Sequence, residues 1–231
     1  MSSKIRFMQA ASCPMDAWCS NRPLWKNCPT NSCSQYYDID YGSHSIIICD
    51  ALSGCPSYNS YAYFPENSFN TLVASGQKNI NIFVTPDGLK IPGGTNKAYI
   101  RFINLAYDEP CLDFRFSDGI LAIARNIGYQ EVTNYYPITA SCYTMQVFRC
   151  NSNRALLNLP NITLKADCSY TFYITGSLVN RPNYDYLVCQ DAMAPICPPP
   201  HHPEFYPPSN HCCGKDSFCS DNFYCGDTFY Y

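Results

Sequence analysis

Cysteine and histidine are the side chains in this sequence with the most distinctive chemistry. Sixteen cysteines and four histidines occur among its 231 residues. Thiolates and imidazoles are ligands that zinc prefers, and paired thiols oxidise to disulfides in oxidising compartments. The composition indicates a disulfide scaffold or a metal site, and every cysteine is a candidate for disulfide bonding: Cys13, Cys19, Cys28, Cys33, Cys49, Cys55, Cys111, Cys142, Cys150, Cys168, Cys189, Cys197, Cys212, Cys213, Cys219 and Cys225.

The segment 191–231 contains three of the four histidines together with five cysteines. His201, His202 and His211 are weak candidates for a metal site there. The last three cysteines recur every six residues, however, and the paired C-x₂-C arrangement of zinc sites is not found. The spacing therefore favours disulfides over zinc, and no cofactor is expected.

Catalysis by a cysteine nucleophile needs a base held within hydrogen-bond reach. His44 and Cys49 are the candidate pair outside the C-terminal segment. They stand five residues apart in one expected strand, so their side chains should point to opposite faces. The sequence therefore predicts a protein that is not an enzyme and has no catalytic residues.

The elements that must position these side chains come in two copies. A period near 100 residues is too long for a solenoid repeat and indicates two copies of one small domain. We expect domains at 1–92 and 93–190, followed by a tail at 191–231. Matching motifs recur in order, with an offset that drifts only from 95 to 101 residues: 4–10 with 99–105, 14–16 with 110–113, 36–39 with 135–138, 45–48 with 144–147, 68–69 with 169–170, and Gly76 with Gly176.

Short alternating segments predict that both copies consist of strands. Residues 143–147, 162–166 and 170–175 alternate apolar and polar side chains, as strands with one buried face do. The Asp-Gly pair at 118–119 predicts a hairpin. Residues 19–33 have little strand character, and we expect disulfides to hold them as a loop. The predicted fold class is all-β, with two tandem immunoglobulin-like β-sandwich domains plus an extended, Cys/Pro-rich C-terminal tail.

The number of cysteines in each part has a consequence for their pairing. The first domain contains six, the second five, and the tail five. If all are oxidised, at least one bond must leave the second domain and at least one must leave the tail. Such bonds join these two parts or join other chains. The candidates for bonds between subunits are Cys197, Cys212, Cys213, Cys219 and Cys225.

Composition also narrows the classes of partner. Aromatic residues, at 15%, outnumber charged residues, at 14%, which favours a surface that contacts other protein. The net charge of −3, with scattered Lys and Arg, argues against nucleic acid as a partner. Because no apolar run approaches the roughly 18 residues of a membrane span, no such span is expected.

The second copy resembles the bacterial family known as domain of unknown function 4397, and the first copy resembles it more loosely, through residues 5–7 and 14–16. Such domains often occur in tandem on bacterial surface proteins, and the resemblance implies an immunoglobulin-like sandwich without established catalytic residues. The high cysteine content and the tail depart from the family pattern. The residues that carry the resemblance are 99–105, 108–110, 112–114, 126–133, 136–137, 141–144, 159–164 and 170–176.

The N-terminal residues lack the apolar region of a classical signal peptide, although the cysteine content suits an oxidising place. Either a signal peptide was removed and a Met added, or the chain reaches an oxidising place without secretion. Proteins of the bacterial spore surface fit the second alternative, because they are made inside a cell that later lyses. The predicted function is a self-assembling structural protein of the spore surface, in the exosporium, the coat or an appendage fibre. Its predicted partners are copies of itself, and possible further partners are other spore-surface proteins.

The alternative prediction is a monomeric, secreted or cell-surface module for adhesion or ligand binding. Its disulfides would lie entirely within the chain. Trp18, Trp25 and Tyr63 would then line a binding groove. Assembly through sheet edges and disulfides between subunits distinguishes the first hypothesis from this one.

Overall fold

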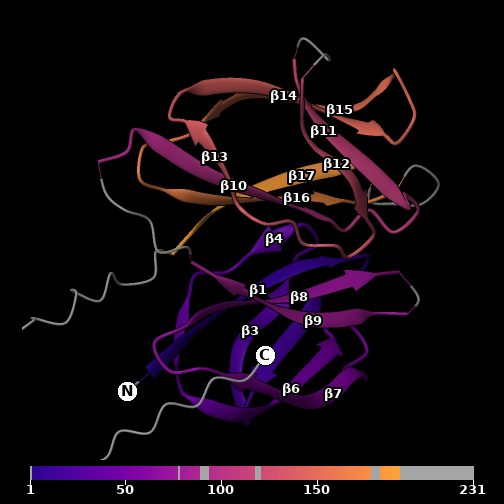
Figure 1. Ribbon diagram of the computed structural model, residues 1–231. Coiled ribbons are helices and arrows are strands. Elements are labelled where there is room, and N and C mark those ends of the chain that lie inside the picture. Colours follow the sequence, from indigo (N-terminus) through magenta and orange to yellow (C-terminus); the bar gives the residue numbers. More distant parts are fainter. Residues whose placement is uncertain (1, 78, 89–93, 118–120, 178–182, 193–231) are drawn as a thin grey trace, which may run out of the picture. The chain divides into compact units, whose positions relative to one another are not determined.

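The computed structural model describes residues 2–77, 79–88, 94–117, 121–177 and 183–192. The regular structure of these residues consists of β-strands, and among them there is no helix long and apolar enough to cross a membrane. Met1–Ile196 form one compact unit. The predicted all-β fold is confirmed (Figure 1).

The first repeat folds into two sheets. Sheet A has the order β4-β1-β8-β9, with β5 also pairing with β1, and β1 and β8 run parallel. Sheet B has the order β3-β2-β6-β7. The strands are β1 (Ser2–Ala11), β2 (Met15–Cys19), β3 (Arg22–Cys28), β4 (Ser32–Cys33), β5 (Tyr37–Asp40), β6 (Gly42–Asp50), β7 (Pro56–Phe64), β8 (Phe69–Gly76) and β9 (Asn81–Asp87).

The second repeat follows the same plan. Sheet C has the order β13-β10-β16-β17, again with a parallel central pair, and sheet D has the order β12-β11-β14-β15. Strand β17 continues through the first residue of the predicted tail. The strands are β10 (Lys97–Asn104), β11 (Cys111–Phe116), β12 (Ala122–Gly128), β13 (Tyr136–Thr139), β14 (Cys142–Arg149), β15 (Ala155–Thr163), β16 (Ser169–Thr175) and β17 (Asp185–Asp191).

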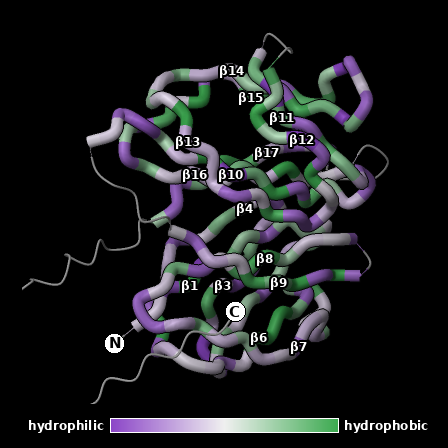
Figure 2. Tube along the Cα trace, in the orientation of Figure 1, coloured by the Kyte–Doolittle hydropathy of each residue, from purple (hydrophilic) through white to green (hydrophobic). Residues whose placement is uncertain are grey.

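Each repeat encloses its own apolar core between its two sheets (Figure 2). In the first repeat, Phe7 of β1 and Ile48 of β6 are fully buried in one cluster. In the second repeat, Phe102 of β10 packs on Phe114 of β11 with ring centroids 4.0 Å apart. These contacts join opposite sheets, as in a β-sandwich.

The repeated glycine of the two copies has a backbone explanation. Gly76 ends β8 with φ of 116°, and Gly176 follows β16 with φ of 84°. A Cβ on Gly76 would collide with the carbonyl oxygen of Asn79. Positive φ and this close approach together require glycine at that position.

The expectation of a disulfide-held loop at 19–33 is wrong. Strand β3 pairs with β2, and β4 pairs with β1 through Met8 opposite Cys33. Register shifts interrupt the β2–β3 ladder between Met15 and Trp18. These bulges obscure the period of two that marks a regular strand, which explains why the pattern was not recognised.

The expectation that residues 170–175 bury one face is also wrong. Every residue of β16 is buried, and β8 is buried on both faces from Asn70 onward. The inward faces of β8 and β16 belong to the two cores. Their outward faces contribute to a third apolar cluster, in which Met8, Val73, Ile103 and Tyr173 from both repeats are fully buried. Sheets A and C are therefore central layers with no solvent-facing side at their middle strands.

Candidate functional site

Two arginines and two aspartates lie buried between the repeats. Arg6 of β1 and Arg101 of β10 occupy equivalent strand positions and are each 3% exposed. Arg6 pairs with Asp191 of the second repeat, and Arg101 pairs with Asp87 of the first. Each arginine therefore binds the aspartate of the other repeat, and the four charges cancel.

Neutral side chains from both repeats complete this network. The Nε groups of Arg6 and Arg101 each donate to a threonine on the neighbouring strand, Thr71 or Thr171, at 2.7 Å. Both threonines in turn donate to the aspartate of their own repeat. Buried charges are tolerated when they are paired and hydrogen-bonded in this way.

Two tyrosines close the network at equivalent positions. Tyr36 donates to Asp87 and Tyr135 to Asp191, both at 2.7 Å. The guanidinium of Arg6 lies 4.8 Å from the ring centroid of Tyr36, and Arg101 stands at the same distance from Tyr135. Burial and the adjacent carboxylates raise the pKa of both tyrosines, which keeps the donors protonated.

Sequence reasoning did not identify this network as a unit. An arginine repeated in the middle of two apolar strands, together with the repeated Tyr36 and Tyr135, was the signal that could have pointed to it. Asp87 and Asp191 stand 104 residues apart, outside the drift of 95 to 101 residues on which the motif comparison relied. The network joins the two repeats through buried ion pairs. Each of its arginines, aspartates and tyrosines is paired within the network.

The predicted separation of His44 from Cys49 agrees with their positions on one strand, β6. His44 faces the core side of β6 and contacts the ring of Phe64, with centroids 6.0 Å apart. Its Nε2 donates to the carbonyl oxygen of Asp40 at 2.8 Å if its Nδ1 accepts from Ser20 at 2.9 Å. With both nitrogens engaged, His44 is not positioned to act on Cys49.

The cysteines of the described residues occupy several environments. Cys111 and Cys150 form a disulfide in the second repeat. Cys55 and Cys142 are exposed thiols, whereas Cys19 and Cys28 are buried ones. The remaining described cysteines are partly buried thiols: Cys13, Cys33, Cys49, Cys168 and Cys189.

The metal candidates and the candidates for bonds between subunits are not placed by the structure. Within its described part, no group of three or more metal-binding side chains lies close together. Outside the described residues lie His201, His202, His211, Cys197, Cys212, Cys213, Cys219 and Cys225.

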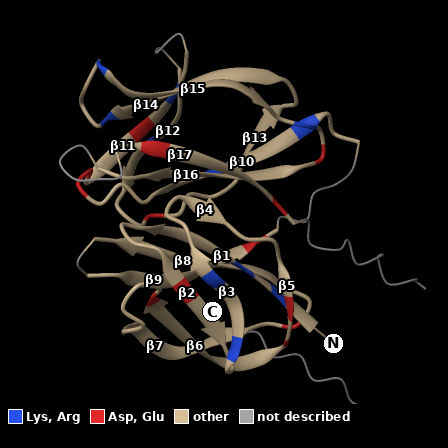
Figure 3. Ribbon diagram, turned by 180° about the vertical axis from the view of Figure 1, so that it is seen from behind, with Lys and Arg blue, Asp and Glu red and all other residues tan. Residues whose placement is uncertain are grey.

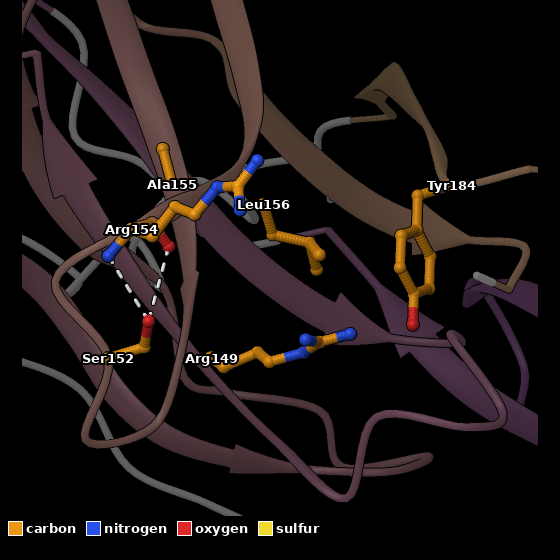
Figure 4. Close-up of a pocket in the computed structure, with 6 residues that line it drawn as sticks. All are labelled: Arg149, Ser152, Arg154, Ala155, Leu156 and Tyr184. Atoms are coloured by element: carbon orange, nitrogen blue, oxygen red, sulfur yellow. Dashed lines mark hydrogen bonds between the residues drawn. The ribbon is translucent and has the colours of Figure 1, made fainter.

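A hollow of about 280 Å³ lies at one end of the second repeat (Figure 4). Arg149, Arg154 and Tyr184 contribute polar groups to its lining. Arg149 Nε donates to Glu109 at 2.7 Å, and Tyr184 donates to Asp108 at 2.8 Å. The ion pair with Glu109 compensates the positive charge of Arg149, and this weakens the attraction of the hollow for anions.

The groove predicted for Trp18, Trp25 and Tyr63 does not form, and that expectation is wrong. Trp25 lies opposite the buried Ala17 and packs edge-on against Phe7, so it belongs to the core side of sheet B. Trp18 faces outward and lines a shallow hollow of about 320 Å³ with Asn21, Ile47 and Cys49. Period-two geometry separates tryptophans that the sequence places close together.

The outer face of sheet B continues from Trp18 across β6 to β7. Strand pairing sets Trp18 beside Ile47 and Ile47 beside Asn59. Farther along β7, Tyr61 is 78% exposed and Tyr63 is 65% exposed. The outer face, defined by Trp18, Ile47, Asn59, Tyr61 and Tyr63, therefore carries three aromatic rings, of which the two tyrosines are exposed and Trp18 is partly exposed. The Lys26 ammonium lies 4.9 Å from the centroid of the Trp18 ring.

Strand β7 is also an unprotected sheet edge. It is nine residues long, lies at the end of sheet B, and carries no charged side chain (Figure 3). Its counterpart β15 contains Pro160 near its middle. Among the described edge strands, leaving aside the two-residue β4, β7 alone has neither a charge nor an internal proline. Charges and prolines are the usual devices that prevent edges from pairing with other chains.

Comparison with protein families gives one match. Residues 3–115 match the model described as "Domain of unknown function (DUF4397)". The match covers the first repeat and reaches β11 of the second, whereas the resemblance seen in the sequence was closer for the second repeat. No curated protein matches the chain.

Three solved structures show a distant likeness to this chain. The C-terminal domain of AlgF from P. aeruginosa is 20% identical, with a TM-score of 0.34, over 42% of this chain and 99% of that one. A CBM26 module of Eubacterium rectale Amy13K in complex with maltoheptaose is 11% identical, with a TM-score of 0.29, over 83% and 98%. A putative cell adhesion protein from Bacteroides fragilis is 8% identical, with a TM-score of 0.22, over 82% and 87%. These scores carry no argument about function.

Proposed function

We propose that this chain, of which residues 3–115 match the DUF4397 model, is a non-enzymatic structural protein that assembles with copies of itself. The observation that carries the proposal is the unprotected edge of β7. An exposed strand edge offers a row of unpaired backbone donors and acceptors, and a strand of another chain satisfies them by extending the sheet.

The proposed contact pairs β7 of one copy with a sheet edge of the next. Tyr61 and Tyr63 flank that edge on the outer face of sheet B, where they would become buried. Tyrosine provides a large contact area at low entropic cost and keeps its hydroxyl available for hydrogen bonds. A contact between unlike edges produces a filament when the rotation it imposes does not close into a ring.

The two joined repeats, the first of which carries the β7 edge, would transmit force from one to the other. The buried Arg6–Asp191 and Arg101–Asp87 pairs couple the two sandwiches within one chain. Force applied at β7 in the first repeat would therefore be transmitted to the second repeat through a charged, hydrogen-bonded layer. A flexible tandem of independent domains would not transmit it in this way.

Exposed thiols are the proposed sites of disulfide bonds between copies. Cys55 immediately precedes β7, and Cys142 begins β14 at the surface of the second repeat. A disulfide between copies converts a reversible contact into one that withstands heat and detergent. The five cysteines of the tail are further candidates for the same role.

The proposed location is the bacterial spore surface, in the exosporium, the coat or an appendage. The support for it is the cysteine-rich composition together with the self-assembly proposed for β7. Other proteins of that surface are the proposed additional partners. Absence of this protein from the surface fraction of purified spores would contradict the location without affecting the proposal of self-assembly.

A pair of charge variants tests the edge contact. Tyr61→Lys with Tyr63→Lys places two like charges on β7, at exposed positions where the fold tolerates them. Asn158→Lys with Thr163→Lys places the same charges on exposed positions of the counterpart strand β15. We expect the β7 variant to remain monomeric in reductant-free solution and the β15 variant to assemble like the parent. Equal assembly of all three proteins would overturn the edge contact.

A further inference from the structure

One pair of thiols lies between the two repeats and has no role in the proposed contact. Cys33 belongs to β4 of the first repeat, and Cys189 belongs to β17 of the second. Both are partly buried thiols in the structure. Although 156 residues of sequence separate them, the fold brings them together.

Strand pairing directs both side chains into the same layer. Cys33 lies directly opposite Met8 on β1, and Cys189 lies directly opposite Thr171 on β16. Directly opposed residues of an antiparallel pair share a face of the sheet. Met8 is in the apolar cluster between the repeats, and Thr171 is in the ion-pair network there. Both cysteines pack against that cluster.

The two thiols face the same apolar cluster and interact with each other. The Cys189 thiol donates a hydrogen bond to the Cys33 sulfur, and this lowers the pKa of Cys33 and raises that of Cys189. Arg6 favours the Cys33 thiolate as well, against burial and the carboxylates of Asp87 and Asp191. The pair therefore consists of a nucleophile and an adjacent resolving thiol.

We infer that Cys33 and Cys189 are a disulfide-forming site that joins the first and second repeats of one chain. This bond is independent of the proposed assembly between chains. It also answers the odd number of cysteines in the second domain, because one of its five must bond outside it if all are oxidised. A bond to Cys33 leaves five of the six cysteines of the first repeat, so one of those must then bond the tail or another chain if all are oxidised.

A small-molecule disulfide, such as oxidised glutathione, is the oxidant. The Cys33 thiolate attacks one of its sulfurs, a mixed disulfide forms, and the first small thiol leaves with the bonding electron pair of the broken S–S bond. Cys189 then loses its proton, and its thiolate attacks the Cys33 sulfur and releases the second small thiol. Two protein thiols are oxidised, one small disulfide is reduced to two thiols, and the protons pass to the released thiolates.

The direct test is peptide mapping of the oxidised full-length protein under non-reducing conditions. Protein purified in reductant is treated with oxidised glutathione, alkylated, and digested with two proteases. The expected result is a linked peptide pair containing Cys33 and Cys189 in the monomeric fraction, which disappears after reduction. Recovery of Cys33 and Cys189 as separately alkylated or glutathionylated peptides would overturn the inference.

A cleavage assay provides a second readout with matched controls. A specific protease site is inserted after Gly94, an exposed residue between the repeats, in a full-length chain whose five tail cysteines are serine. After oxidation and cleavage, the halves should remain joined on a non-reducing detergent gel. Cys33→Ser or Cys189→Ser should separate them, whereas the exposed-thiol controls Cys55→Ser and Cys142→Ser should not.

Two results of the cleavage assay would contradict the inference. One is separation of the halves in the oxidised parent, and the other is persistence of the link in Cys33→Ser. Failure of the proposed assembly would show itself differently, as a parent protein that never forms species larger than the monomer. The two proposals can therefore fail separately.

Discussion

Arg6, in the first strand of the chain, forms a buried ion pair with Asp191, the last residue of its last described strand. The pair spans 185 positions of sequence and joins the two repeats. Arg101 and Asp87 repeat the relationship in the opposite sense. Each arginine also lies near the aspartate of its own repeat, Arg6 Nε at 3.5 Å from Asp87 and Arg101 Nε at 4.0 Å from Asp191, so the four charges form one cluster that both repeats share.

Removal of one partner of this network should be costly. We expect Arg6→Met to reduce the free energy of unfolding by roughly 3–5 kcal/mol, because it leaves an uncompensated buried carboxylate. Urea unfolding followed by tyrosine and tryptophan fluorescence measures the loss. Arg22→Met, at an exposed position of β3, should change stability by less than about 0.5 kcal/mol. A similar small change in both variants would contradict the account of the network.

Arg6 and Asp191 should be energetically coupled. Arg6→Met combined with Asp191→Asn should destabilise the protein by less than the sum of the single changes, with a difference of about 0.5–3 kcal/mol. The reason is that the second change removes the charge that the first leaves unpaired. Arg6→Met combined with Asp113→Asn, in sheet D, should be additive. Strict additivity in the first cycle would show that the two side chains do not interact.

The disulfide of the second repeat should contribute to its stability. Cys111 and Cys150 enclose a sequence separation of 39 residues, and we expect Cys111→Ser with Cys150→Ser to cost about 2–4 kcal/mol. The first repeat has Pro14 and Ala51 at the equivalent positions, joined only by a backbone hydrogen bond of 3.0 Å. Cys55→Ser, which removes an exposed thiol, is the matched control for urea unfolding. Equal stability of the double variant and the parent in non-reducing buffer would refute the prediction.

Acid should destabilise the turn that precedes β16. Backbone N–H groups of Gly94 and Thr95 donate to the Asp167 carboxylate at 2.9 and 3.2 Å and hold its pKa below the usual 3.8. A depressed pKa contributes stability above the unfolded pKa, and that contribution is lost as the pH falls through the folded pKa. The melting temperature should therefore fall less steeply below about pH 4 in Asp167→Asn than in the parent. An identical acid profile in both proteins would argue against this contribution.

The sequence allowed the sandwich architecture to be predicted because apolar alternation and the repeated motifs are local signals. Strand β3 escaped prediction because bulges between Pro23 and Trp25 and between Trp25 and Cys28 break its alternation. Trp25 was placed in a groove because sequence proximity to Trp18 does not reveal which face each occupies. Full burial of β16 was missed because Thr171 and Thr175 read as solvent-facing, although they lie between the repeats. Local sequence patterns do not show which strand faces lie between two sheets, and the predictions that depended on this were therefore wrong.

The unprotected edge of β7 was likewise recognised only from sheet order. Its sequence reads as an ordinary strand, and its significance depends on its lying at the end of sheet B rather than in the middle. Tyrosine content predicted contacts between subunits in general terms. The fold narrows them to Tyr61 and Tyr63, which are the most exposed tyrosines among the described residues.

The most direct test of self-assembly is negative-stain microscopy of the purified protein, with a matched gel of samples boiled in detergent with and without reductant. The account predicts ordered polymers, and a ladder that collapses to the 26.1 kDa monomer only when reductant is present. Polymers that dissociate without reductant would contradict the proposed disulfide bonds between copies. Discrete particles with a single monomer band under both conditions would contradict assembly itself.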